Sequence, residues 1–374
     1  MALILQSIRV SSRLQGATLG KPSNVTTMQT PPIDPPLSAK VAFLSRPQAY
    51  GAAVTRVDVI ETHMSLLFLT EQHVYKLKKP ISNQLMDFST TAARHRNAIE
   101  EVRLNQRLAA TVYLAVIPLS FTERNGFVLR GESHVVDWLV LMRRLPARQM
   151  LDQRLQANFI DRDEIEGIAA LLACFYANAA AVAISEQEYL ARFEQVIAIN
   201  RAELSAPMYQ LDTTRIGSLC QLHADFLQQH PLRLTQRAAA QRIIEAHGDL
   251  RPEHICVDKP PVAIDCLEFN RALRLLDPVD ELAYLSMECE LLAPTMAVGI
   301  EQSLFAVYRQ HCHDAAEPAL ICFYKSVRAT TRARLMVLHL RDHPETQWPK
   351  WLGKAHAYLQ LAEKYASLFE QFHD

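Results

Sequence analysis

The pattern of hydrophobic and polar residues changes its period part-way along the chain. From about residue 54 to residue 142, apolar residues alternate with polar ones or form short runs, which is typical of β-strands. The expected strands are Val57–Ile60, Leu66–Leu69, His73–Lys79, Val116–Leu119, Gly126–Leu129 and Val135–Met142. Between the third and fourth of them, Ala92–Leu108 carries an apolar stripe and is expected to form a helix.

Beyond about Asp163 the apolar residues recur at intervals of three and four, as they do on one face of a helix. The expected helices are Ile165–Ala183, Glu186–Leu204, Ile216–Gln229 and Gln236–Glu245, another starting near Asp280, and three or four more. Two short apolar runs, Ile255–Val257 and Val262–Ile264, predict a β-hairpin. We therefore expect an α+β, two-lobed fold, with an N-terminal lobe over residues 39–142 and a helical C-terminal lobe over residues 143–374.

The first 38 residues have a different composition. They contain Arg9, Arg13 and Lys21 but no acid before Asp34, and they end in a proline-rich run. Such a segment is compatible with an organellar targeting peptide, a disordered tail or an over-extended start. We leave it out of the predicted fold.

Composition narrows the classes of partner. The formal net charge of −1 gives no reason to expect nucleic acid or an anionic membrane as a partner. Seven cysteines without any CxxC pair favour reduced thiols and a cytoplasmic location over a disulfide framework. Apolar runs are all broken by charge before they reach the length of a membrane span. We expect a soluble protein that acts on a small molecule, and the oligomeric state stays open.

The predicted hairpin has a carboxylate on each side of it. Asp249 lies in the loop before the first strand, and Asp265 follows the second strand directly. Folding the hairpin should therefore bring the two side chains together. Such a pair suits phosphoryl transfer, because one carboxylate can accept a hydroxyl proton while the other holds a divalent cation on a nucleotide.

The same residues carry a family resemblance. The segment His247–His254, HGDLRPEH, resembles the catalytic loop of protein-kinase-like phosphotransferases, in which a metal-binding Asn follows the Asp by five positions. Its His-Gly-Asp start is similar to that of aminoglycoside phosphotransferases and other small-molecule kinases. The resemblance implies Asp249 as the catalytic residue and Asp265 as a Mg²⁺ ligand. His254 stands where the pattern has Asn, and so becomes the second candidate metal ligand, although imidazole suits Mg²⁺ less well than oxygen.

The N-terminal lobe offers candidates for nucleotide binding. By itself the strand with Lys76 and Lys78 could be an exposed edge strand protected by lysines. The resemblance instead implies that Lys76, or alternatively Lys78, binds the phosphates of ATP. Its partner would be a glutamate of the following helix, Glu101 by register or else Glu100.

Two further segments complete the expected nucleotide site. The loop between the first two strands has no glycine, and Thr62 and Ser65 either line a phosphate site or belong to an ordinary hairpin turn. Leu141–Arg144, including Met142, would form the hinge beside adenine. The segments Glu61–Ser65, Val74–Pro80 and Asp87–Thr90 together resemble an uncharacterised bacterial branch of the family, in which some members carry a fused P-loop ATPase. The present chain contains no GxxxxGK[ST] motif, so we do not expect that module in it.

Two supporting residues and one departure follow from the same resemblance. His247 is expected to brace the catalytic loop by hydrogen bonding, and Asp280 to anchor that loop from below. Phe175 and Tyr176 lie where this branch would carry a histidine. The sequence thus predicts an ATP- and Mg²⁺-dependent phosphotransferase acting on a hydroxyl of a small molecule. The alternative is a catalytically impaired kinase-fold protein that binds a nucleotide or a partner as a regulatory module.

Overall fold

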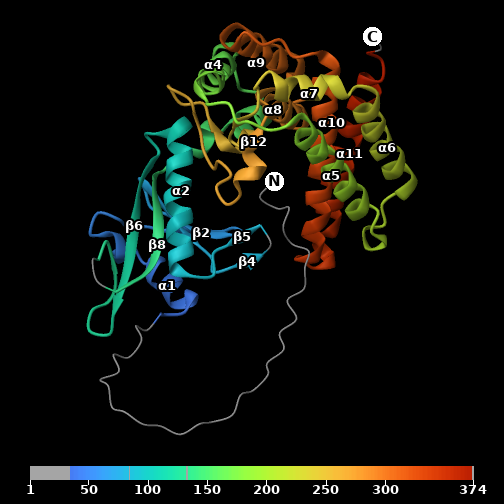
Figure 1. Cartoon of the computed structure of the whole chain (residues 1–374). Coiled ribbons are helices and arrows are strands. Elements are labelled where there is room, and N and C mark those ends of the chain that lie inside the picture. The colour runs from blue at the N-terminus through green and yellow to red at the C-terminus, as the bar shows by residue number, and fades with distance from the viewer. Residues whose placement is uncertain (1–33, 84, 132–133, 373–374) are drawn as a thin grey trace, which may run out of the picture. The chain divides into compact units, whose positions relative to one another are not determined.

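A computed structural model describes residues 34–83, 85–131 and 134–372 of the chain, which fall into two compact units (Figure 1). The smaller unit contains the described residues up to 102 together with residues 112–144. The larger unit contains residues 103–111 and the chain from residue 145 onward. The expected N-terminal segment of 38 residues lies outside the described part as far as residue 33.

The smaller unit is built on a six-stranded antiparallel sheet in the order β1-β2-β3-β8-β6-β7. Its strands are β1 (Asp58–Glu61), β2 (Ser65–Leu69), β3 (His73–Lys78), β6 (Tyr113–Thr122), β7 (Gly126–Leu129) and β8 (Val135–Arg143). Around them lie α1 (Leu37–Leu44), the ribbon of β4 (Ser82–Asn83) and β5 (Met86–Asp87), and the first part of α2 (Thr91–Ala109). The six expected strands and the expected helix are confirmed.

The alternation of apolar and polar residues along the strands explains how this sheet forms a core. Leu77 of β3 pairs with Leu139 of β8, and both side chains are completely buried with Phe68 and Leu119 in one core cluster. Because β3 lies between β2 and β8, its lysines are not on an edge strand. The reading of Lys76 and Lys78 as protection of an exposed edge is therefore wrong.

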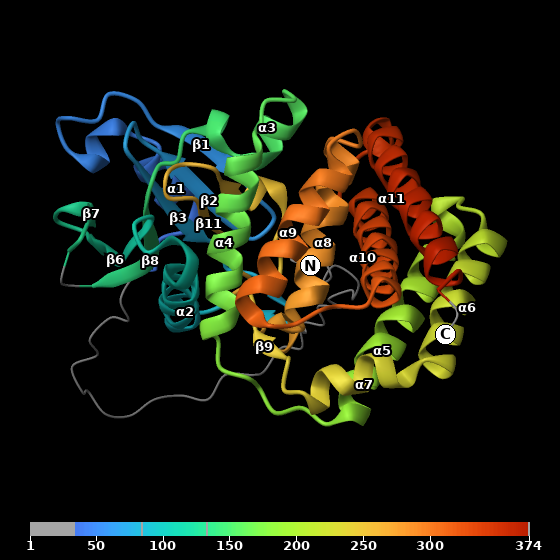
Figure 2. The ribbon, with the colours of Figure 1, turned by 90° about the horizontal axis from the view of Figure 1, so that it is seen from above.

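The larger unit is mainly helical. Its helices are α3 (Leu151–Gln156), α4 (Arg162–Asn178), α5 (Glu186–Leu204), α6 (Thr213–Gln229), α7 (Pro231–Ala239), α8 (Pro278–Leu292), α9 (Ala297–Cys312), α10 (Pro318–Leu338) and α11 (Trp348–Phe369). Four short strands accompany them: β9 (Ile244–Glu245), β10 (Ile255–Cys256), β11 (Val262–Ala263) and β12 (Leu275–Leu276). Helices α10 and α11 lie side by side, as do α4 and α9 (Figure 2). None of the described helices combines the length and the apolar character needed to cross a lipid bilayer.

One expected helix is misplaced. The stretch Gln236–Glu245 was expected to be helical after a break at Pro231, but α7 begins at Pro231 and ends at Ala239. Proline is well suited to the first helical position, where its missing N–H leaves no hydrogen bond unmade. Ile244 then enters β9 and pairs with Leu276 of β12, so its apolar side chain belongs to a strand.

A buried ion network joins three segments of the larger unit. Arg237 of α7 makes paired hydrogen bonds to Asp277, at 2.7 and 2.8 Å, and to Asp314, at 2.7 and 2.6 Å. Asp277 is completely buried and also caps α8 by accepting a hydrogen bond from the backbone N–H of Val279. Arg237 is therefore the counter-ion that both carboxylates share, and Asp314 has a second, more distant one in Arg242 at 3.9 Å.

Replacing Arg237 with Met should lower the free energy of unfolding by about 3–5 kcal/mol, because buried Asp277 loses its counter-ion and Asp314 keeps only the more distant Arg242. Urea denaturation of both proteins measures the change. Arg162→Met is the matched control: its partner Glu166 is one turn away and the pair is exposed, so we expect a loss below about 0.5 kcal/mol. Equal losses in the two variants would contradict this account of the network.

Candidate active site

The expected β-hairpin is present in the larger unit. Strands β10 and β11 are antiparallel, with Ile255 opposite Ala263 and Cys256 opposite Val262. The backbone N–H of Ile264 continues the pairing by donating to the carbonyl oxygen of His254 at 2.8 Å. This hydrogen bond places Asp265 beside the catalytic-loop segment.

His254 lies between the two carboxylates. Its Nδ1 donates a hydrogen bond to the backbone oxygen of Asp249 at 2.8 Å and lies 4.0 Å from Oδ2 of the same residue. Its Nε2 lies 3.7 Å from Oδ2 of Asp265. Asp265 has a left-handed backbone, with φ of 60°, which is uncommon for a residue other than glycine. The hairpin thus brings both carboxylates within 4.0 Å of one imidazole. The sequence predicted that the two carboxylates approach each other, but not that His254 lies between them.

Asp249 is buried among positively charged and hydrogen-bonding groups. Nε of Arg251 lies 3.1 Å from its Oδ1, and the hydroxyl of Tyr284 donates to the same oxygen at 3.2 Å. Burial alone would raise the pKa of Asp249, but the charge of Arg251, helped by His254 and Arg332, holds this pKa well below its usual range. The carboxylate is therefore ionised and can accept a hydrogen bond from a hydroxyl group.

His247 braces the loop, as expected. The imidazole is completely buried, and its Nε2 donates to the backbone oxygen of Ile264 at 2.9 Å while its Nδ1 accepts from the N–H of Asp249. Burial, helped by the nearby His254, lowers the pKa of His247 to about 4. The ring is therefore neutral and links the loop to the end of the hairpin.

The residue that holds the loop from below is Glu281, so the expectation for Asp280 is wrong. The carboxylate of Glu281 accepts hydrogen bonds from the backbone N–H groups of Gly248, at 2.7 Å, and His247, at 3.2 Å. Asp280 instead pairs with Arg328 of α10 at 2.6 Å. On a helix, consecutive residues point in directions about 100° apart, and one position decides which acid faces the loop.

Tyr176 is one of the two residues, with Phe175, at the place where the resemblance implied a histidine. Its hydroxyl donates to Glu281 at 3.0 Å, so the carboxylate that holds the loop has a third donor. Gly248 needs its glycine, because its φ is 89° and an added Cβ would lie 2.9 Å from the Cβ of Arg274. These contacts fix the loop in one conformation.

Two further supports were missed by the sequence analysis. Arg107 of α2 donates to the backbone oxygens of Glu245, at 2.6 Å, and Ala246, at 3.0 Å, directly before the catalytic loop. Its guanidinium lies 5.0 Å from the ring centre of Phe175. Asn105 accepts from the N–H of Cys266 at 2.8 Å. These partners are more than 60 positions apart in sequence, and a helical Asn or Arg gives no local signal for them.

In the smaller unit both candidate lysines contact the same glutamate. Nζ of Lys76 lies 2.8 Å from Glu101, and Nζ of Lys78 lies 2.5 Å from it. The side chain of Lys78 is 2% exposed and that of Lys76 is 12% exposed, so solvent reaches Lys76 more readily. Glu101 is completely buried and is held by both amines.

The other three candidates for nucleotide binding, Thr62, Ser65 and Met142, lie in the sheet or in its first hairpin turn. The hydroxyl of Thr62 donates to the backbone oxygen of Ser65 and accepts from its N–H, both at 3.0 Å, so the two residues close a hairpin turn. Met142 lies inside β8, opposite Val74 on one side and Tyr113 on the other. A nucleotide-binding role for Thr62, Ser65 and Met142 stays a prediction.

The charge and chemistry of the site fit a hard cation at Asp265 better than at His254. Asp265 has a carboxylate that is about half exposed, and Mg²⁺ is commonly held by one or two carboxylates together with phosphates and water. Nη2 of Arg251 lies 3.2 Å from Nε2 of His254, and Nδ1 is bound to Asp249. Within the described ranges, no group of three or more His, Cys, Asp or Glu side chains is arranged to hold a metal ion.

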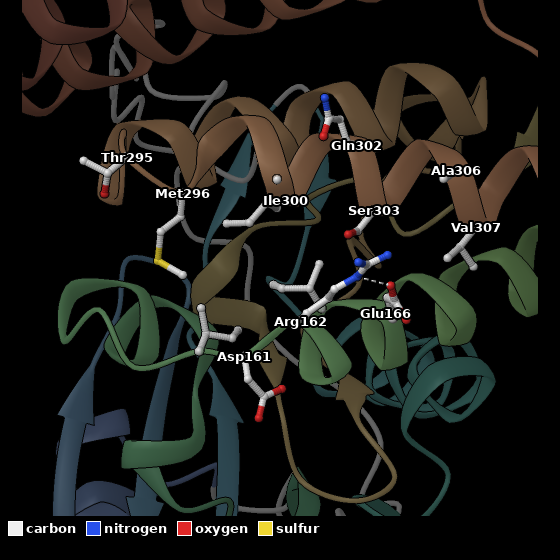
Figure 3. Close-up of a pocket in the computed structure, with 13 residues that line it drawn as sticks. Asp161, Arg162, Glu166, Thr295, Met296, Ile300, Gln302, Ser303, Ala306 and Val307 are labelled. Atoms are coloured by element: carbon white, nitrogen blue, oxygen red, sulfur yellow. Dashed lines mark hydrogen bonds and ion pairs between the residues drawn. The ribbon is translucent and has the colours of Figure 1, made fainter.

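A cavity of about 510 Å³ lies away from the catalytic loop, between the start of α4 and helix α9 (Figure 3). Ile300 of α9 and Met296, the residue before that helix, line it. Its arginine, Arg162, is paired with Glu166 at 2.6 Å. The charge of this arginine is therefore already compensated without a ligand.

Comparison of the structure with solved structures identifies the fold. The choline kinase of Cryptosporidium parvum Iowa II superimposes with a TM-score of 0.51 over 89% of this chain and 96% of that chain, at 8% sequence identity. The chain has a protein-kinase-like fold. A choline/ethanolamine kinase family protein from Mesorhizobium loti gives 0.49 over 89% of this chain and 98% of that one, at 14% identity. At 8% identity the likeness to the choline kinase shows the fold alone, and it confirms the α+β, kinase-like prediction.

Sequence comparisons lead to relatives whose activity is not known. The uncharacterized proteins Rv2004c of Mycobacterium tuberculosis and Mb2027c of Mycobacterium bovis are each 30% identical over 285 residues, which is 75% of this chain and 54% of theirs. The chain thus spans about half the length of the curated relatives that it matches. No family model matches the sequence.

Replacing His247 with Gln should make stability less dependent on pH. The folded protein holds this imidazole neutral, with a pKa of about 4, whereas the unfolded chain binds the proton at about pH 6.5. Stability is therefore lost as the pH falls from about 6.5 toward 4, and His247 contributes about 2 kcal/mol of that loss by pH 5. Urea denaturation at pH 7 and pH 5 measures how much free energy of unfolding each protein loses between the two pH values. An equal loss in the wild type and the variant would contradict the conclusion that the fold holds His247 neutral.

Proposed function

We propose that this protein transfers the γ-phosphate of ATP to a hydroxyl group of a small molecule. In the larger unit, Asp249 would accept a hydrogen bond from that hydroxyl and orient it. Asp265 would hold Mg²⁺, which when bound neutralises phosphate charge. In the smaller unit, Lys76, positioned by Glu101, would bind phosphate oxygens. We further propose that the protein is cytoplasmic and needs neither nucleic acid nor membrane.

One observation carries this proposal. The β10–β11 hairpin places Asp265 beside a loop whose Asp249 is kept ionised by Arg251 and hydrogen-bonded by Tyr284. The loop itself is held by Glu281 and His247, so Asp249 has little freedom to move. Preorganised charge of this kind is what phosphoryl transfer requires of a protein.

A second candidate function follows from His254. Its ring occupies the place of the Asn that would offer a hard oxygen to a second metal ion, and Nδ1 is bound to Asp249. The protein would then be a kinase-fold module that binds a nucleotide or a partner with little turnover. Nucleotide binding and turnover distinguish the two functions.

Calorimetry with ATP, in the presence and absence of Mg²⁺, tests the nucleotide site. We expect wild-type binding to be strengthened about tenfold or more by Mg²⁺, and Asp265→Asn to remove that gain because the cation loses its carboxylate. Asp258→Asn, in the turn of the same hairpin, is the matched control and should behave like the wild type. No ATP binding by the wild type in either condition would contradict the phosphotransferase and leave only a kinase-fold module that binds a partner.

Replacing His254 with Asn separates an enzyme from an impaired kinase. ADP release would be measured with and without a mixture of hydroxylated metabolites. If the natural site is competent, it works without a metal ligand at residue 254. The substitution should then change the rate of ADP release by less than about threefold. A gain of about tenfold or more would favour the impaired module instead, since the new amide oxygen would then have restored a missing ligand.

A further inference from the structure

A second cavity in the larger unit lies where α5, α10 and the segment 272–276 meet. Its volume is about 460 Å³, and most of its wall is apolar, with Phe193 and Val196 from α5, Leu276 from β12 and Val327 from α10. The same wall contains three arginines, Arg192, Arg328 and Arg334. A cavity that combines apolar walls with cations has the composition of a small-molecule site.

Two of these arginines are neutralised by the protein. Arg328 makes paired hydrogen bonds to Asp280, at 2.8 and 2.6 Å. Arg192 donates to Glu188 at 2.8 Å and to the backbone oxygen of Leu275 at 3.2 Å. Their charges are therefore compensated without a ligand.

Arg334 has no such compensation. Its side chain is only 3% exposed and lines the cavity, yet within the described part of the chain it makes no hydrogen bond and has no carboxylate within 4.0 Å. Burial lowers its pKa to about 10, and the more distant Glu203 opposes that shift only in part, so the guanidinium is charged at neutral pH. A buried and unpaired charge costs considerable free energy, and a protein that keeps one normally uses it.

The neighbours of Arg334 indicate the shape of a ligand. Val327, Thr331 and Arg334 follow one another at intervals of four and three on α10, so they lie on one face of the helix. The hydroxyl of Thr331 accepts from Asn200 at 3.0 Å and keeps its own hydrogen for another acceptor. The face therefore presents an apolar group, a hydroxyl donor and a guanidinium in sequence.

We propose that this cavity binds a small organic anion with an apolar body, whose carboxylate or phosphate pairs with Arg334 and accepts from Thr331. An anion supplies the charge that the protein lacks at this point, and the apolar body covers Phe193 and Val196. Arg328 connects the cavity wall with the catalytic loop, because its guanidinium lies 5.3 Å from the ring centre of Tyr284, which donates to Asp249. The ligand is therefore either the phosphate acceptor or a regulator, and the binding itself requires no nucleotide.

Titration of the full chain with 1-anilinonaphthalene-8-sulfonate, an apolar fluorescent anion, tests the site directly. We expect saturable binding by the wild type and an affinity lower by about tenfold or more in Arg334→Met, because the sulfonate loses its counter-ion. The affinity for N-phenyl-1-naphthylamine, which lacks the sulfonate, should differ by less than about twofold between Arg334→Met and the wild type. Phenyl phosphate should displace the sulfonate probe, whereas phenol at the same concentration should not.

Two controls separate loss of the site from loss of the fold. Arg309→Met, at an exposed position of α9, should bind both probes as the wild type does. Arg334→Met should melt at the same temperature as the wild type or higher, because it removes an uncompensated buried charge. Unchanged affinity for the sulfonate in Arg334→Met, or equal loss of both probes, would overturn the proposal. Phosphorylation of a bound hydroxylated anion would identify the acceptor, and binding without consumption would identify a regulator.

Discussion

The catalytic loop depends on one buried carboxylate. Backbone N–H groups of His247 and Gly248 are turned away from water, and burial without an acceptor would cost about 1–3 kcal/mol for each of them. Glu281 accepts both, and Tyr176 donates to the same carboxylate. This contact holds the start of the loop directly before Asp249.

Other parts of the larger unit serve the same purpose. Arg107 binds the two backbone oxygens that precede the loop, Asn105 binds the N–H of Cys266, and His247 binds the last residue of the hairpin before Asp265. Each of these contacts saturates a buried backbone group. The positions of Asp249 and Asp265 are therefore a consequence of hydrogen bonds made by residues that take no part in the chemistry.

Among the described residues of this unit, most buried charges are paired with an opposite charge, and the buried guanidinium of Arg334 is not. Arg237 is matched by Asp277 and Asp314, Arg328 by Asp280, and Arg332 by Glu288 at 2.8 Å. Desolvated ions are stable only with such partners. Against this background, the unpaired guanidinium of Arg334 in a mostly apolar cavity marks a place where the counter-charge comes from outside the chain.

The sequence by itself determined the strands, most helices and the approach of Asp249 to Asp265, because period and hairpin turns are local properties. It also determined that Lys76 or Lys78 would meet a glutamate of the next helix. Only the tertiary structure decided that both lysines share Glu101, that Glu281 and not Asp280 holds the loop, and that His254 lies between the carboxylates. These choices depend on which side of a helix or strand faces a partner distant in sequence, and no local pattern encodes that direction.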